Sequence, residues 1–119
     1  MLTASPSVRV YIACEPVDLR RGHDGLVALV RSTLSFDPYA GHLFAFVGKR
    51  AQGIKVLFWD RGGFVVYYKR LAKGRFCLPK LPQDATALIL DATELSMLLG
   101  GFDLAFKKRS QSWEPKHAA

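Results

Sequence analysis

The feature that most constrains the fold is a pair of strand-like segments on either side of a tight-turn sequence. Segments 54–59 and 64–69 are rich in β-branched and aromatic residues and flank Asp60-Arg61-Gly62-Gly63. Such runs predict strands, and the double glycine suits a hairpin turn that needs positive φ. A third segment of this kind, 42–48, comes earlier in the chain, and a short polar turn connects it to segment 54–59. Three consecutive strands with short connections predict an antiparallel β-meander.

Four other segments complete the predicted fold. Residues 8–13 and 87–90 have the composition of strands. Within 23–34, apolar residues recur at the spacing of a helix that buries one side. A second helix begins at Asp91, because Asp91 as N-cap and Glu94 three residues later form a capping box. The sequence therefore predicts an α+β domain: an antiparallel meander of about four to five strands with two amphipathic helices covering one face.

The length of 119 residues is that of one domain. We expect a flexible N-terminal tail over 1–6, a single α+β domain over 7–105, and a basic, mobile C-terminal tail over 106–119. No apolar run approaches the roughly 20 residues of a membrane span. The N-terminus shows no secretory signal, and the two cysteines, Cys14 and Cys77, are expected to be reduced. These features predict a cytoplasmic protein without a membrane partner.

The positive charge of the chain is concentrated in one segment. Nine of the 17 basic residues and a single acid lie between Lys49 and Lys80, so this segment carries +8 while the rest of the chain carries −1. The same segment interleaves its cations with six aromatic residues. Basic residues interleaved with aromatics on strands indicate a surface for a polyanion, above all nucleic acid.

The turn length decides which hairpin residues share a face. A two-residue loop, Arg61-Gly62, places on one face a mixed set of cations and aromatics: Lys55, Leu57, Trp59, Phe64, Val66, Tyr68 and Arg70. The other face then holds a more aliphatic set that suits the core: Ile54, Val56, Phe58, Val65, Tyr67 and Lys69. A three-residue loop would exchange the pairing. The mixed face suits base stacking and phosphate neutralisation; the alternative is that its aromatics are core and its cations are solvated edges.

Candidate nucleic-acid contacts come from two parts of the chain. Arg20 and Arg21 precede a helix N-terminus, which itself favours anions; internal ion pairing at a helix start is the alternative reading. The basic segment adds six cations and two rings that are candidates for stacking: Lys55, Arg61, Lys69, Arg70, Lys73, Arg75, Trp59 and Tyr68. The sequence leaves open which nucleic acid is bound, and the oligomeric state.

The pattern of reactive side chains argues against catalysis. A metal-dependent nuclease needs several carboxylates that converge on metal ions, and the only group with that potential is Asp18, Asp24 and Asp60, whose spacing does not require them to meet. The three histidines form no metal-ligand pattern, and no CxxC motif occurs. We therefore expect no enzymatic activity, no metal and no cofactor.

Five motifs, spread over roughly residues 8 to 104, resemble a known family. They are PVDLRRGHDGL at 16–26, DPYAGHLFAF at 37–46, KVLFWDRGGF at 55–64, YKRLAKGRF at 68–76 and LSMLLGGFD at 95–103. The chain resembles the small accessory proteins called TnpB, encoded by the second reading frame of bacterial insertion sequences of the IS sixty-six type. It departs from the family pattern at His23, where Phe is usual, and at Phe58, where Trp is common.

The resemblance implies a role in transposition beside a separate, larger transposase that carries the cutting and joining chemistry. Together with the charge pattern it predicts a non-catalytic accessory protein that binds DNA through the basic hairpin and assists the transposase. The alternative is a module that docks the transposase and does not contact DNA itself.

Overall fold

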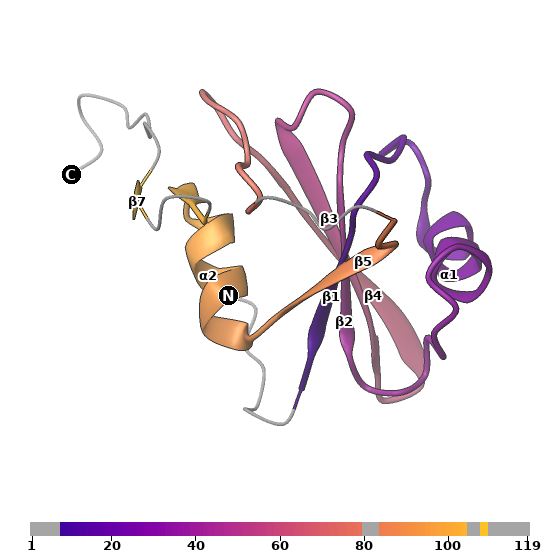
Figure 1. Ribbon diagram of the computed structural model, residues 1–119. Helices are drawn as coiled ribbons and strands as arrows, with labels where there is room; N and C mark the ends of the chain where they lie inside the picture. Colours follow the sequence, from indigo (N-terminus) through magenta and orange to yellow (C-terminus); the bar gives the residue numbers. More distant parts are fainter. Residues whose placement is uncertain (1–7, 80–83, 105–107, 110–119) are drawn as a thin grey trace.

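The computed structural model describes residues 8–79, 84–104 and 108–109 (Figure 1). The elements are β1 (Val10–Ala13), α1 (His23–Ser32), β2 (Leu43–Val47), β3 (Gly53–Asp60), β4 (Gly63–Arg70), β5 (Ala87–Leu90), α2 (Ala92–Leu99), β6 (Phe102–Asp103) and β7 (Lys108–Arg109). The tails predicted over 1–6 and 106–119 lie outside the described residues, except that β7 pairs with β6. No helix in the described ranges has the length and apolarity to cross a membrane.

The main sheet has five strands in the order β4-β3-β2-β1-β5. Strands β2, β3 and β4 form the predicted antiparallel meander, and the α+β fold class is confirmed. Strand β1 pairs parallel with β2, because the chain returns through α1 between them, and β5 pairs antiparallel with β1 at the other edge. The sheet is therefore mixed, with β4 and β5 as its two edge strands.

The two helices lie on opposite faces of the sheet, as Figure 1 shows. The expectation that both helices cover one face was wrong. Every residue of β1 and β2 is buried, and successive side chains point alternately to two separate core clusters. Phe44 and Phe46 pack with α1, whereas Leu43, Ala45 and Val47 pack with α2. Each apolar face of the sheet is covered by one helix, so the domain has three layers.

The hairpin has the predicted two-residue turn. Asp60 pairs with Gly63, and the register places Lys55 opposite Tyr68. Arg61 has φ 33° and Gly62 has φ 87°, which are the positive values that a tight hairpin turn requires. The ladder continues beyond the strands, since Leu71 N–H donates to Gln52 O at 2.8 Å. The register therefore fixes the face on which each hairpin side chain lies.

The capping box of α2 is present as predicted. The Asp91 carboxylate accepts from Glu94 N–H at 2.7 Å, and Glu94 Oε1 accepts from Asp91 N–H at 3.1 Å. The other end of α2 has no basic residue in its last turn. Lys69 of β4 supplies a cation there, because its Nζ donates to Leu99 O at 2.6 Å. Such a contact is favourable at the negative end of a helix.

Candidate functional site

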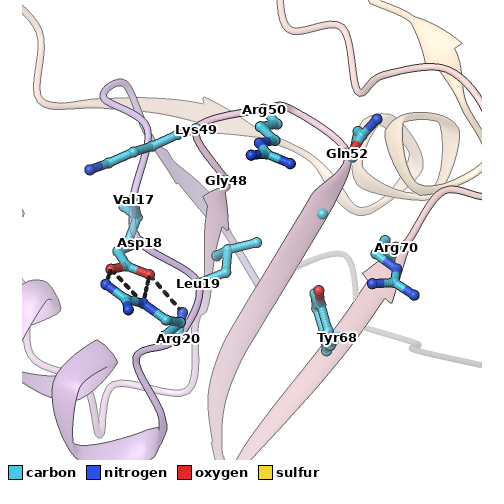
Figure 2. Close-up of a pocket in the computed structure, with 11 residues that line it drawn as sticks. Val17, Asp18, Leu19, Arg20, Gly48, Lys49, Arg50, Gln52, Tyr68 and Arg70 are labelled. Carbon is cyan, nitrogen blue, oxygen red and sulfur yellow. Dashed lines mark hydrogen bonds and ion pairs between the residues drawn. The ribbon is translucent and has the colours of Figure 1, made fainter.

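An open depression of about 380 Å³ lies where the base of the β3–β4 hairpin meets the segment between β1 and α1 (Figure 2). Three parts of the chain form it: residues 17–20, the β2–β3 turn, and the end of β4. The described residues that line it are Val17, Asp18, Leu19, Arg20, Gly48, Lys49, Arg50, Gln52, Gly53, Tyr68 and Arg70. Four of these are cations and one is an acid, so the lining carries a formal charge of +3.

Two glycines allow the 17–20 segment to lie against the sheet. A Cβ added at Gly48 or at Gly53 would lie 2.9 Å from Leu19 Cδ1, which is too close for either position to carry a larger residue without a shift. The backbone beside Leu19 is fixed as well, because Val17 N–H donates to Val47 O at 2.9 Å. Leu19 thus anchors the segment that carries Asp18 and Arg20.

Asp18 and Arg20 form a fork-shaped ion pair on one wall of the depression, as Figure 2 shows. Arg20 Nη2 donates to Asp18 Oδ2 at 2.7 Å, Arg20 Nε donates to both carboxylate oxygens at 3.1 Å, and Arg20 N–H donates to Oδ1 at 3.0 Å. These hydrogen bonds hold the pKa of Asp18 well below its usual value and raise that of Arg20. The Arg20 side chain is still 91% exposed, so its outer edge faces solvent.

Lys49 and Arg50 lie in the β2–β3 turn at the rim of the depression. The turn is held by hydrogen bonds from Ala51 N–H to Gly48 O at 2.9 Å and from Phe76 N–H to Ala51 O at 2.7 Å. Both cations belong to the basic segment, but neither was among the contacts predicted from the sequence. Gly48 pairs with Val17, which is distant in sequence. Only the fold therefore shows that Lys49 and Arg50, which follow Gly48, lie near the 17–20 segment.

Tyr68 and Arg70 rise from β4 on the other side of the depression, two residues apart on one face of the strand. The Tyr68 side chain lies over Gly53, because a Cβ there would be 3.2 Å from its Cε1. Lys55 Nζ lies 5.3 Å from the ring centroid and donates to Arg21 O at 2.9 Å. Tyr68 remains 53% exposed. The structure therefore brings Arg20, Tyr68 and Arg70 together, and Lys55 Nζ lies over the Tyr68 ring.

The remaining predicted contacts lie elsewhere. Lys69 lies on the opposite face of the hairpin, where it binds the end of α2. Arg61 is exposed at the hairpin tip, and Lys73 and Arg75 are exposed in the irregular connection after β4. Trp59 is half-buried near the tip and packs against the rings of Tyr39 and Phe64 at centroid distances of 4.9 and 5.0 Å.

The mixed face of the hairpin is open only at its base. Leu57 is fully buried, and Phe64 and Val66 pack with it in the core cluster under α1. For the central part of this face, the packing matches the alternative interpretation, in which its side chains belong to the core, because they lie in the cluster under α1. Among the described residues, no group of three or more His, Cys, Asp or Glu side chains is placed to hold a metal ion. Both cysteines are free, and burial raises the pKa of each thiol.

Fold and site together define a small basic α/β/α-layered protein with a cationic depression at one end of a mixed sheet. The chain belongs to the family described as IS66 Orf2 like protein, whose profile matches residues 8–109, and this confirms the resemblance drawn from its motifs. It is therefore an accessory protein associated with transposition.

Two relatives from Sinorhizobium fredii (strain NBRC 101917 / NGR234) match over nearly their full length. The chain is 39% identical over 119 residues to "Uncharacterized protein y4jC", covering 100% of both chains. It is 34% identical over 115 residues to "Uncharacterized protein y4hO", covering 97% of this chain and 96% of the relative. No solved structure matches the chain.

Proposed function

We propose that this protein binds the DNA backbone through the depression and so assists a separate transposase. The observation that carries the proposal is the convergence of Arg20, Lys49, Arg50 and Arg70 from three separate parts of the chain onto one open surface. Among the described residues that line it, Asp18 is the one acid, and it faces Arg20. Cations gathered in this way neutralise phosphates and release counterions.

The chemistry of the lining favours binding without strong sequence preference. Arginine and lysine that contact phosphates position a protein on DNA but do not read the bases. Arg20, Arg50 and Arg70 each carry a planar group that can donate two parallel hydrogen bonds to one phosphate. The protein would thus add affinity for DNA to a transposition complex whose cutting and joining reactions are performed by the transposase.

A fluorescence anisotropy titration with labelled duplex DNA tests the proposal. We compare wild type, the variant R50Q/R70Q, and the matched control R9Q/R31Q, which removes two exposed cations outside the depression. Removing two phosphate contacts should lower affinity about 100-fold at 50 mM salt and reduce the slope of log K against log salt by about 1.8. The control should change affinity by less than about threefold.

Two outcomes contradict the proposal. Equal losses in the two double variants would mean that only the net charge matters and that the depression is not the site. Absence of wild-type binding to both duplex and single-stranded DNA at 50 mM salt would favour the alternative, a module that docks the transposase without DNA. That alternative predicts co-purification with the transposase at high salt, where contacts that depend on exposed charges weaken.

A further inference from the structure

We infer that Tyr68 is a stacking platform for an unpaired base, so that the depression prefers single-stranded over duplex DNA. This inference rests on the proposed function and adds the class of ligand to it. The large apolar or aromatic side chains exposed in the described part of the chain are Tyr39, Val65, Tyr68 and Ile89. Of these, Tyr68 alone lines the depression.

The environment of Tyr68 holds the ring in place while leaving part of it open. Gly53 gives room for the ring on the neighbouring strand, since a Cβ there would lie 3.2 Å from Cε1 and 3.4 Å from the hydroxyl of Tyr68. Lys55 Nζ lies 5.3 Å from the centroid, and Lys55 is itself held by Arg21 O. A ring supported in this way loses little conformational freedom when a ligand packs on it.

The cations beside the ring complete a site for one nucleotide strand. Arg70 lies on the same face of β4 two residues further on, and Arg50 lies at the rim (Figure 2). An exposed aromatic ring flanked by cations is the arrangement that binds single strands, where bases stack on the ring and the phosphates meet positive charge. In a duplex the faces of the bases are already stacked on one another, so Tyr68 would gain nothing from it.

The other ring proposed for stacking is differently placed. Trp59 lies at the opposite end of the hairpin, where its partners are Tyr39 and Phe64. The three rings contact one another, with Tyr39 and Phe64 at 5.1 Å. None of these three rings lines the depression. The choice between the two rings that the sequence left open therefore falls on Tyr68.

The test compares a labelled oligothymidine with a duplex of equal length at about 100 mM salt, using wild type, Tyr68→Leu and Tyr68→Phe. The wild type should bind the single strand more tightly. Because stacking on one ring contributes about 1–3 kcal/mol per base, Tyr68→Leu should lose about tenfold or more for the single strand and less than about twofold for the duplex. Tyr68→Phe, which keeps the ring, should stay within about twofold of wild type for both.

A strand of the same length made of abasic nucleotides serves as the matched ligand, and Tyr68→Leu should bind it as well as the wild type does. If Tyr68→Leu does not fold, Tyr68→Thr replaces it, because threonine suits an edge strand. Equal wild-type affinity for single strand and duplex, or equal losses in the Leu and Phe variants, would overturn the inference and leave the proposed function standing. Absence of binding to either DNA would remove the proposed function itself.

Discussion

The two ends of the β3–β4 hairpin contain the same kinds of residue in different environments. At the tip, Trp59 packs against Phe64 and Tyr39, and the Arg31 guanidinium lies 5.6 Å from the Tyr39 ring centroid. At the base, the Tyr68 ring lies over Gly53 and is 53% exposed beside the cations of the depression. At the tip three rings pack against one another, although Tyr39 is still 49% exposed, whereas at the base a single exposed ring lies beside several cations.

Segments of similar composition can therefore have different surroundings in the fold. Both ends combine aromatics with basic residues, but only the base meets two other segments that contribute further cations. What separates them is that Phe64 packs in the core cluster under α1, whereas Tyr68 lies at the open end of the sheet. An interleaved basic and aromatic segment can thus be part core and part exposed surface.

The largest expected effect tests the tip as a structural cluster. Trp59→Ala removes a half-buried ring from contact with two others and should lower the free energy of unfolding by about 2–3 kcal/mol. Tyr68→Ala should lower it by less than about 1 kcal/mol, because the ring is largely exposed. Chemical denaturation of both variants checks this difference. Equal destabilisation would mean that the two ends play the same part in the fold.

The glycines at the two ends should respond differently to substitution by alanine. Gly53→Ala should destabilise the fold by about 2 kcal/mol and weaken DNA binding, because the new Cβ displaces Leu19 and Tyr68 together. Gly62→Ala meets no atom within 4 Å, but its φ of 87° strains an alanine by about 1 kcal/mol. It should leave DNA binding unchanged. Denaturation and anisotropy on the same samples distinguish a need for space from a need for positive φ.

The neighbouring residues Lys69 and Arg70 lie on opposite faces of β4, and we expect one to serve stability and the other DNA binding. Lys69→Met loses the hydrogen bond to Leu99 O and should cost about 1.5 kcal/mol of stability, with no change in the salt dependence of DNA binding. Arg70→Met should do the reverse, with unchanged stability and a salt slope smaller by about 0.9. A loss of DNA affinity in folded Lys69→Met equal to that in Arg70→Met would refute this division of roles.

The smallest expected effect concerns Asp18. Asp18→Asn keeps an oxygen that can accept Arg20 N–H but removes the only negative charge among the described lining residues, so DNA should bind about three- to tenfold more tightly at low salt. The lowered pKa of Asp18 means that its carboxylate is charged at any pH above about 4. The gain should therefore be the same at pH 5.5 and pH 8, and a gain confined to one of these values would point to another group.

The local features of the fold followed from the sequence because they depend on neighbouring residues. The sequence predicted the hairpin around Arg61-Gly62 and limited its register to two alternatives, of which the structure has the two-residue turn. Asp91 with Glu94 marked the start of α2. The side of the sheet on which each helix packs could not be predicted in this way. Helical periodicity shows which face of a helix is apolar, but both faces of this sheet are apolar.

The candidate site was only partly predictable for a similar reason. Alternation along β4 separated Lys69 from Arg70, but it could not show that Lys69 meets Leu99, 30 residues away. Lys49 and Arg50 were counted in the basic segment but were not predicted as contacts. Their part in the candidate site depends on Arg20, which the packing of Leu19 brings to the same depression. Contacts between distant segments carry no signal in a single sequence.

The space above Gly53 has a consequence for how this family can change over time. One absent methyl group makes room for both Leu19 and Tyr68, so the sizes of the residues at these three positions are coupled. In a relative with a side chain at the position of Gly53, the residues at the other two positions must shift or be smaller. We expect the three positions to vary together among relatives, while the rim cations at Lys49 and Arg50 vary independently of them.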